Sequence, residues 1–220
     1  SEIAKKYNVA NNNFNGFNIL QQDISKVGAI DIGFYNPDFA QNFDQNIKNH
    51  INKFNPVVFL LSSDEINHSI LEGAFIVYLG HHGDDLAQLA DIVLPSPAYT
   101  EKSSTYMNME GRVLQTTRCY HPLGVSKEEW KIFRALSNNF SQKLKFNNLS
   151  ELRNEISNLF PVFKEINNLP PSSKLDFGSS TKIEDRVLEY NIKNFYMTDV
   201  ISRASITMAN CTREILNKVA

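Results

Sequence analysis

The chain has 220 residues, 42% of them hydrophobic and 21% charged, with a formal net charge of −2. This composition is typical of a globular protein, and a compact chain of this length removes roughly 70% of its unfolded surface from water. The small net charge gives no basis for nucleic acid or an anionic membrane as a partner. No apolar run approaches the roughly 20 residues that span a bilayer, so we expect no direct membrane insertion.

The cysteines and the first residue bear on compartment and extent. Cys119 and Cys211 are far apart and belong to no Cys-x-x-Cys or Cys/His cluster. This spacing favours a reducing compartment and argues against a metal site built on cysteine. The sequence begins with Ser1, so we expect a processed chain or a piece of a longer protein.

Two helices are predicted before the first strand. Residues 17–29 have apolar side chains at spacings of three and four, which is typical of an amphipathic helix. A second helix is predicted to begin with Asn36 as its cap and Pro37 as its first residue, and to end before Pro56. Its expected apolar face consists of Phe39, Phe43, Ile47, Ile51 and Phe54.

Three short apolar segments are predicted to be strands: 57–61, 74–80 and 92–95. The first is apolar throughout, as expected of a strand covered by helices on both faces. The connections can form short helices, the second capped by Asp84 and with Leu86, Leu89 and Ala90 facing inward. This alternation predicts an α/β fold with an open, mainly parallel sheet flanked by helices.

Further elements follow the predicted sheet, the first a strand around residues 113–117. Ser126 with Glu129 and Asn148 with Glu151 have the spacing of capping boxes, predicting helices to about Phe140 and Phe160. The expected buried residues of the first of these helices are Trp130, Phe133, Ala135 and Leu136. The predicted organisation is an α/β part over 1–145, a helix and Pro/Ser-rich linker over 146–190, and a C-terminal docking segment over 191–220.

The loop Gly80-His81-His82-Gly83-Asp84-Asp85 follows the strand 74–80. In open parallel sheets, ligands commonly bind beyond the carboxyl ends of the strands. A metal site is disfavoured because adjacent side chains usually point opposite ways and further ligands are not evident. A phosphate cradle is possible with these glycines, but the aspartates would repel it and no known phosphate motif is present. The favoured interpretation is structural: glycines shape a turn, Asp84 caps a helix, and the histidines bond to loop backbone.

Other polar residues leave similar alternatives open. Glu101 and Glu110, with the aspartates of the loop, could be paired carboxylates, although carboxylates near turns are usually solvated. Arg112 could form an ion pair with either glutamate. The C-terminal residues Tyr196, Asp199 and Arg203 could belong to an active site, but a terminal turn and helix more often dock onto a neighbour.

Three segments carry a resemblance to a known family. Residues 80–117 closely resemble the C-terminal domain of the large iron–sulfur subunit (the G type) of respiratory complex I, the NADH:ubiquinone oxidoreductase. Residues 126–137 (SKEEWKIFRALS) and 194–205 (NFYMTDVISRAS) are similar to later parts of the same domain. The resemblance extends from about Gly16 to Met208.

The resemblance implies a fold similar to the molybdopterin oxidoreductases. The pattern shared with them is Ala90-Asp91-Ile92-Val93-Leu94-Pro95, then Glu101, Thr105, Asn108, Glu110-Gly111-Arg112 and Gln115. In the complex I subunit this domain is taken to have lost the pterin and to serve as a scaffold. The resemblance therefore implies no catalytic residue, cofactor or metal in this chain. It also implies a vestigial pocket rim formed by Gly80, His81, His82, Gly83, Asp84, Asn108, Glu110 and Arg112.

The function implied is a non-catalytic structural part of the hydrophilic arm of complex I. The iron–sulfur clusters are expected in a complementary N-terminal half of the same subunit, which would be a partner together with other subunits of the arm. Expected interface residues are Phe195, Tyr196, Asp199 and Arg203. The expected location is the matrix side of the mitochondrial inner membrane, or the cytoplasmic face of the bacterial membrane.

The chain is expected to be incomplete by itself, as one piece of a split or proteolysed subunit, because a sheet entered midway leaves strand edges and apolar faces exposed. Two alternatives remain. One is a fragment of an active molybdopterin-dependent enzyme such as a formate dehydrogenase, and the other is a stand-alone nucleotide-binding domain.

Overall fold

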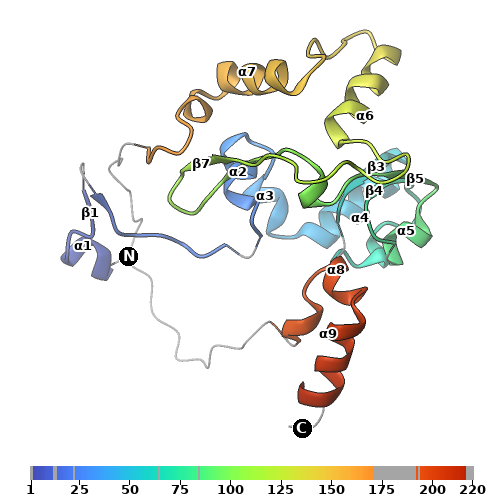
Figure 1. Ribbon diagram of the computed structural model, residues 1–220, viewed down its shortest axis with the longest axis horizontal. Helices are drawn as coiled ribbons and strands as arrows, with labels where there is room; N and C mark the ends of the chain where they lie inside the picture. Colours follow the sequence, from blue (N-terminus) through green and yellow to red (C-terminus); the bar gives the residue numbers. More distant parts are fainter. Residues whose placement is uncertain are drawn as a thin grey trace. The chain divides into compact units, whose positions relative to one another are not determined.

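The computed structural model describes residues 2–11, 14–21, 23–63, 65–83, 85–170, 192 and 194–216 (Figure 1). The chain divides into two compact units. The first comprises 1–41, 99–120 and 132–184, and the second comprises 42–98, 121–131 and 185–220. No helix among the described residues is long and apolar enough to cross a membrane.

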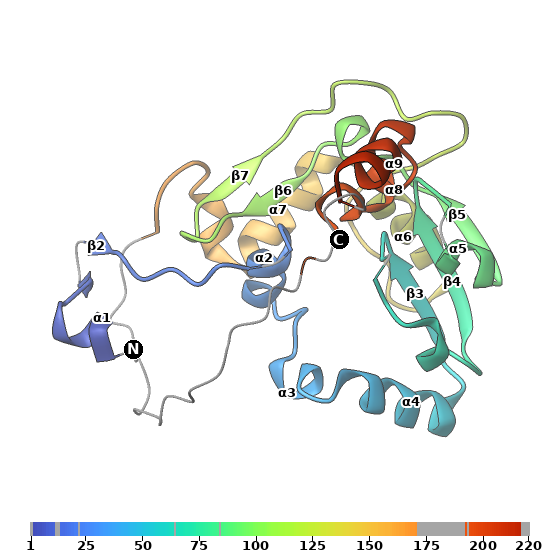
Figure 2. The ribbon, with the colours of Figure 1, turned by 90° about the horizontal axis from the view of Figure 1, so that it is seen from below.

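The second unit contains a three-stranded parallel sheet of β3 (Val57–Leu61), β4 (Phe75–Gly80) and β5 (Ile92–Pro95), in that order. Figure 2 shows the three strands side by side. The fold class and the three predicted strands are therefore confirmed. A side-chain bond fixes one strand end, since the Ile76 amide donates to Asp91 Oδ2 at 2.7 Å.

One face of this sheet carries the core of the second unit. Leu60, Ile76 and Tyr78 from the strands are buried with residues from the helices around them. These helices are α4 (Phe43–Phe54), the 3₁₀ turn η1 (His68–Ile70) and α5 (Asp85–Leu89). In α5, Leu86 is buried but Leu89 is exposed, contrary to expectation, and Ala90 directly after the helix packs against the core. Asp84, the predicted cap, lies outside the described residues.

The opposite face is only partly covered. Side chains on a strand alternate between faces, and the register places five exposed apolar residues on this one. They are Val57, Phe59, Leu61, Phe75 and Ile92. Val77 and Leu79 on the same face are buried. The prediction that helices cover β3 on both faces is thus wrong for this chain, because the side chains on its outer side stay exposed.

The predicted helix over 17–29 is much shorter in the structure. α2 extends only over Lys26–Asp31, and residues 17–21 are not helical. Leu20 and Ile24 are 83% and 78% exposed, so much of the predicted apolar face faces solvent. Because an isolated helix gains most of its stability from packing, apolar spacing without a partner does not establish one.

The predicted second helix begins as expected but is divided. Asn36 Oδ1 accepts from the amides of Asp38 and Phe39 at 3.0 and 3.1 Å, which confirms the cap of α3 (Pro37–Ala40). The chain then turns before α4. That helix ends at Asn55, which is left-handed with φ 43°, directly before Pro56.

The first unit is built around a hairpin and α7. Strands β6 (Thr105–Met107) and β7 (Val113–Gln115) are antiparallel, and β6 was not predicted. Met107, Val113 and Phe163 form its core, with Val27 of α2 among the packed neighbours. Smaller elements of this unit are α1 (Glu2–Lys6), β1 (Ala10–Asn11), β2 (Phe14–Asn15) and η2 (Tyr99–Glu101).

The two predicted capping boxes have different outcomes. α7 (Leu149–Leu159) is capped as predicted, since Asn148 Oδ1 accepts from the Glu151 amide at 2.9 Å and Glu151 Oε2 accepts from the Asn147 amide at 2.6 Å. The helix is followed by η4 (Pro161–Lys164).

The capping box predicted at Ser126 does not form, so this prediction is wrong. Helix α6 begins only at Glu129 and ends at Leu136, followed by η3 (Ser137–Asn139). The Ser126 hydroxyl is buried and has no hydrogen-bond partner among the described residues. Trp130, Phe133 and Leu136 are only half-buried and Ala135 is exposed. The side chain buried at the start of α6 is Glu128, which accepts from Trp130 Nε1 at 2.6 Å.

The C-terminal segment consists of short helical turns: η5 (Phe195–Met197), α8 (Val200–Arg203), α9 (Ile206–Cys211) and the π-helical turn η6 (Thr212–Leu216). This agrees with the predicted turn and helix. Most of the predicted linker, 171–191, lies outside the described residues. The predicted boundaries at residues 145 and 190 stay predictions.

Candidate functional site

The loop after β4 depends on Tyr78. This side chain is 2% exposed, and its hydroxyl donates to the His82 carbonyl at 3.3 Å. Tyr78 and Gly80 are two residues apart on a strand and therefore share a face. A Cβ at position 80 would collide with the Tyr78 ring. Gly80 is thus required by the close approach of Tyr78.

Gly83 does not have a comparable role. A Cβ added there would meet no atom within 4 Å, and its φ is not in the left-handed region. Of the two glycines predicted to shape the turn, only Gly80 is therefore required, and the reason is the Tyr78 ring and not the turn. Sequence reasoning missed Tyr78, although an aromatic residue two positions before a glycine on a strand was a usable signal.

The two histidines contact each other. His81 Nδ1 and His82 Nδ1 are 2.7 Å apart, and the rings are edge to face with centroids 5.0 Å apart. The expectation that adjacent side chains point opposite ways is wrong here, because the residues lie in a bend after the strand. The observed bond joins the two rings, and the expected bonds to loop backbone stay a prediction.

A metal site would need more ligands than these two nitrogens. No group of three or more His, Cys, Asp or Glu residues that could hold a metal occurs among the described residues. Asp84 is not among the described residues. The geometry therefore supports a local contact at the end of β4, and the absence of a metal stays a prediction.

Asn108 organises the second group of predicted rim residues. Its Oδ1 accepts from the amides of Glu110 and Arg112, both at 3.0 Å, and its Nδ2 donates to Glu110 Oε2 at 3.2 Å. Gly111 has φ +81°, and a Cβ there would also lie 2.9 Å from Pro170 Cγ. These bonds close the tight turn between β6 and β7.

The Arg112 side chain forms its interactions at the same turn. Its Nε lies 3.6 Å from Glu110 Oε2, and its Nη1 donates to the Asn167 carbonyl. Of the two glutamates considered, Glu110 is therefore the partner. The Arg112 side chain is 31% exposed, and that of Glu110 is 50% exposed, so this pair contributes little to stability. The loop after β4 belongs to the second unit and this turn to the first, so a common pocket rim stays a prediction.

The C-terminal interface candidates differ in what they do. Asp199 Oδ1 accepts from the amides of Ile201 and Ser202, and Oδ2 accepts from the Ser202 hydroxyl at 2.6 Å. The Ser202 hydroxyl, together with the two amides and nearby Arg203, lowers the pKa of Asp199 despite partial burial. Asp199 is a helix cap. Phe195 is 60% exposed and Tyr196 is half-buried.

Asn194 and Thr212 are structural residues that sequence reasoning missed. Asn194 Oδ1 accepts from the Tyr196 amide, and Nδ2 donates to Thr212 Oγ1 at 3.1 Å. These bonds connect the two ends of the C-terminal segment. The apolar side chains left exposed on it are Phe195, Ile201, Ile206 and Ile215.

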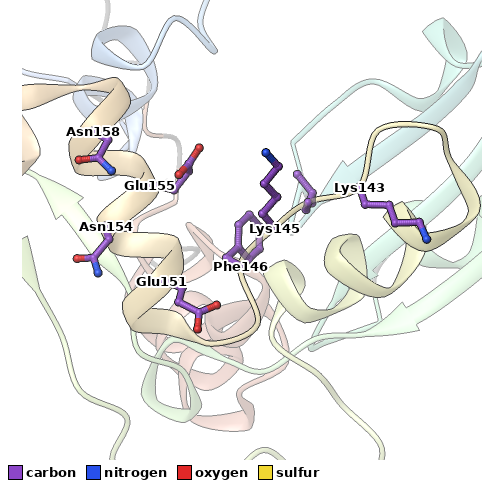
Figure 3. A pocket seen from close by; sticks show the side chains of 8 residues that line it. Lys143, Lys145, Phe146, Glu151, Asn154, Glu155 and Asn158 are labelled. Carbon is purple, nitrogen blue, oxygen red and sulfur yellow. The ribbon is translucent and has the colours of Figure 1, made fainter.

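Two cavities flank α7, and none of the predicted rim residues lines either one. The first has a volume of about 440 Å³. Figure 3 shows Lys143, Lys145 and Phe146 of the preceding loop across from Glu151 and Glu155 of the helix. Charges of both signs line this cavity. The second cavity lies along another side of α7, and its described lining residues include Arg153 and Lys164 but no carboxylate.

The family follows from comparison with known proteins. Residues 1–139 match the family model described as molybdopterin oxidoreductase. The chain belongs to the molybdopterin oxidoreductase family. Residues 171–211 match a second model, which describes the C-terminal part of the G subunit of NADH-ubiquinone oxidoreductase.

The proteins that are similar in sequence to this chain include bacterial and mitochondrial proteins. The NADH-quinone oxidoreductase G subunit of Rickettsia felis is 35% identical over 96% of the chain. The mitochondrial NADH-ubiquinone oxidoreductase 78 kDa subunit of Candida albicans is 40% identical over 96%, and the 75 kDa subunit of Reclinomonas americana is 36% identical over 96%. The chain spans 30%, 29% and 30% of these relatives, respectively.

Proposed function

We propose that the chain is a structural, non-catalytic part of the hydrophilic arm of the proton-pumping NADH:quinone oxidoreductase. The observation that carries the proposal is the order of the matches. The match to the molybdopterin oxidoreductase model is followed along the chain by the match to the model of the C-terminal part of the G subunit. Relatives that are named as subunits of NADH-quinone or NADH-ubiquinone oxidoreductase align over nearly the whole chain.

The local geometry supports a structural role. Tyr78 bonds to the His82 carbonyl, and Asn108 and Glu110 are bonded within their own turn. Catalytic groups need a free functional atom directed at a substrate. The polar atoms of these candidates instead close turns, which favours a scaffold over an active site.

We also propose that the iron–sulfur clusters lie in a complementary N-terminal portion. A [4Fe–4S] or [2Fe–2S] cluster usually takes four cysteine ligands, and this chain has only Cys119 and Cys211. The exposed apolar face of β3 supplies a surface for such a partner. In mitochondria the complex would place the chain on the matrix side of the inner membrane, and in bacteria on the cytoplasmic face.

The test is purification of the native assembly through a tag on this chain, followed by mass spectrometry and electron paramagnetic resonance. We expect a cysteine-rich polypeptide with iron–sulfur signals to copurify with other subunits of the arm. Recovery of the chain without a cysteine-rich polypeptide and without iron–sulfur signals would contradict the proposal.

A second candidate is a fragment of an active molybdopterin enzyme, which the match over residues 1–139 favours. Metal analysis of the same purified assembly separates the two. Molybdenum or tungsten in stoichiometric amount would support the enzyme, whereas iron without either metal agrees with the scaffold.

A further inference from the structure

The second cavity along α7 is a groove of about 870 Å³ within the first unit. This volume is in the range of ligand-binding clefts, roughly 300–1,000 Å³. Its lining includes the cations Arg153 and Lys164, the amides Gln115, Asn154 and Asn158, and Phe163, which is itself part of the core. The described residues that line it include no aspartate or glutamate.

Arg153 has fewer hydrogen-bond acceptors than its guanidinium can use. Nη2 donates to the Ser104 carbonyl at 3.3 Å, while Nε is buried and has no partner among the described residues. A buried donor without an acceptor costs free energy, and in native structures such a group usually indicates a missing partner. The planar fork of arginine matches a carboxylate or another oxyanion best.

The described carboxylates on and beside α7 do not line the groove. Glu151 accepts from the Asn147 amide and the Asn148 side chain at the start of α7. Glu165 accepts from Asn168 Nδ2 at 3.0 Å. Glu155 lines the other cavity, as Lys145 also does (Figure 3). The Lys164 ammonium group forms no hydrogen bond or ion pair with the described residues. The groove therefore keeps its positive charge.

We propose that this groove, named the Arg153 groove, binds an acidic segment of a partner polypeptide through a carboxylate placed on Arg153 and Lys164. A free inorganic anion would fill little of 870 Å³. An extended segment would fill more, with its backbone facing the amide side chains of Asn154 and Asn158 that line the groove. The charge and volume of the groove favour such a segment whichever complex the chain belongs to.

The first test is zero-length carbodiimide cross-linking of the native assembly, read by mass spectrometry. We expect Lys164 to be joined to an aspartate or glutamate outside residues 1–220. The ion pair of Lys131 Nζ with Glu128 Oε2, at 3.4 Å, is the internal control for the reagent. If that control link forms and Lys164 is unlinked, or is linked only within this chain, the proposal is overturned.

The second test compares Arg153→Gln, Arg153→Lys and the control Lys143→Gln by the rate at which the tagged chain dissociates from the assembly in moderate salt. Loss of one member of a buried charge pair mainly affects dissociation, so we expect Arg153→Gln to accelerate it about tenfold or more. Arg153→Lys keeps the charge and should recover part of the effect, and Lys143→Gln should match the wild type. Equal rates for Arg153→Gln and Lys143→Gln would overturn the proposal.

The remaining occupant to distinguish is a free anion, with inorganic phosphate as the probe. If phosphate raises the melting temperature of the wild-type assembly but not that of Arg153→Gln, and Lys164 is not cross-linked, the groove is a site for a small anion. That result would overturn the proposal of a polypeptide segment. Phosphate without effect, with Lys164 linked to a partner carboxylate, supports the segment.

Discussion

Gly80 shows how a single residue can be required by its neighbour on the same strand. The Tyr78 ring occupies the space that a side chain at position 80 would need, and its hydroxyl reaches the His82 carbonyl. The sequence suggested a backbone or ligand role for this glycine. Its requirement is instead steric, set by a buried aromatic ring that belongs to the core of the second unit.

We predict that Gly80→Ala destabilises the protein by about 1–3 kcal/mol, because the added methyl group overpacks the site and displaces Tyr78. Gly83→Ala is the matched control. It should change stability by less than about 0.5 kcal/mol, since a Cβ there meets no atom. Urea denaturation of the purified protein measures both. Equal effects of the two substitutions would show that the Tyr78 contact is not the cause.

At the scale of elements, the two capping boxes separate sequence pattern from structure. Both have the same spacing, yet only Asn148 accepts the predicted amide bond. Ser126 precedes the first residue of α6 by three positions and its hydroxyl is buried without a partner among the described residues. The pattern identifies a helix start, but the path of the chain before the helix decides which residue becomes the cap.

We predict that Asn148→Ala lowers the free energy of unfolding by about 1 kcal/mol, the usual cost of a lost cap. Ser126→Ala should be neutral or slightly stabilising, because it removes a buried hydroxyl that bonds to none of the described residues. Denaturant unfolding of the two variants checks this directly. A larger loss for Ser126→Ala than for Asn148→Ala would contradict the structure.

The cap of α8 should respond to pH. The pKa of Asp199 is lowered from its ordinary value of 3.8, chiefly by the Ser202 hydroxyl. A carboxyl whose folded pKa is below its unfolded pKa stabilises the folded form above the unfolded value and loses this effect as pH falls through the folded value. We therefore expect α8 to be fully capped at neutral pH and to fray below pH 3.8.

Amide chemical shifts of Ile201 and Ser202, followed by NMR from pH 7 downward, measure this transition. Asp199→Asn is the control, since an asparagine can still cap but does not titrate in this range. Its shifts should stay constant where those of the wild type move. A wild-type midpoint above 3.8 would contradict the lowered pKa.

At the scale of the whole molecule, the sheet has one face covered by helices and one partly open. Phe59 is 38% exposed while its strand neighbour Leu60 is 3% exposed. Exposed apolar patches in native proteins often mark interaction surfaces. The open face thus agrees with the proposal that the chain assembles with a larger partner.

We predict that Phe59→Ser changes the stability of the isolated chain little but reduces its copurification with the proposed iron–sulfur partner severalfold. Leu60→Ala is the contrast, because it leaves a cavity in the core and should cost about 2–5 kcal/mol of stability. Urea unfolding and pull-down yield distinguish the two. Unchanged copurification of Phe59→Ser would exclude this face as the contact surface.

The sequence by itself determined the three strands of the sheet and their parallel direction, the caps at Asn36 and Asn148, and the family. These follow from local signals, namely apolar runs, capping side chains and motif spacing. Only the tertiary structure decided that Tyr78 lies over Gly80, that the outer face of β3 is open, that His81 meets His82, and that residues 17–21 form no helix. The open face and the missing helix depend on which distant segment packs against a residue, whereas the two local contacts depend on how the chain bends at the end of β4. Periodicity along the chain encodes neither.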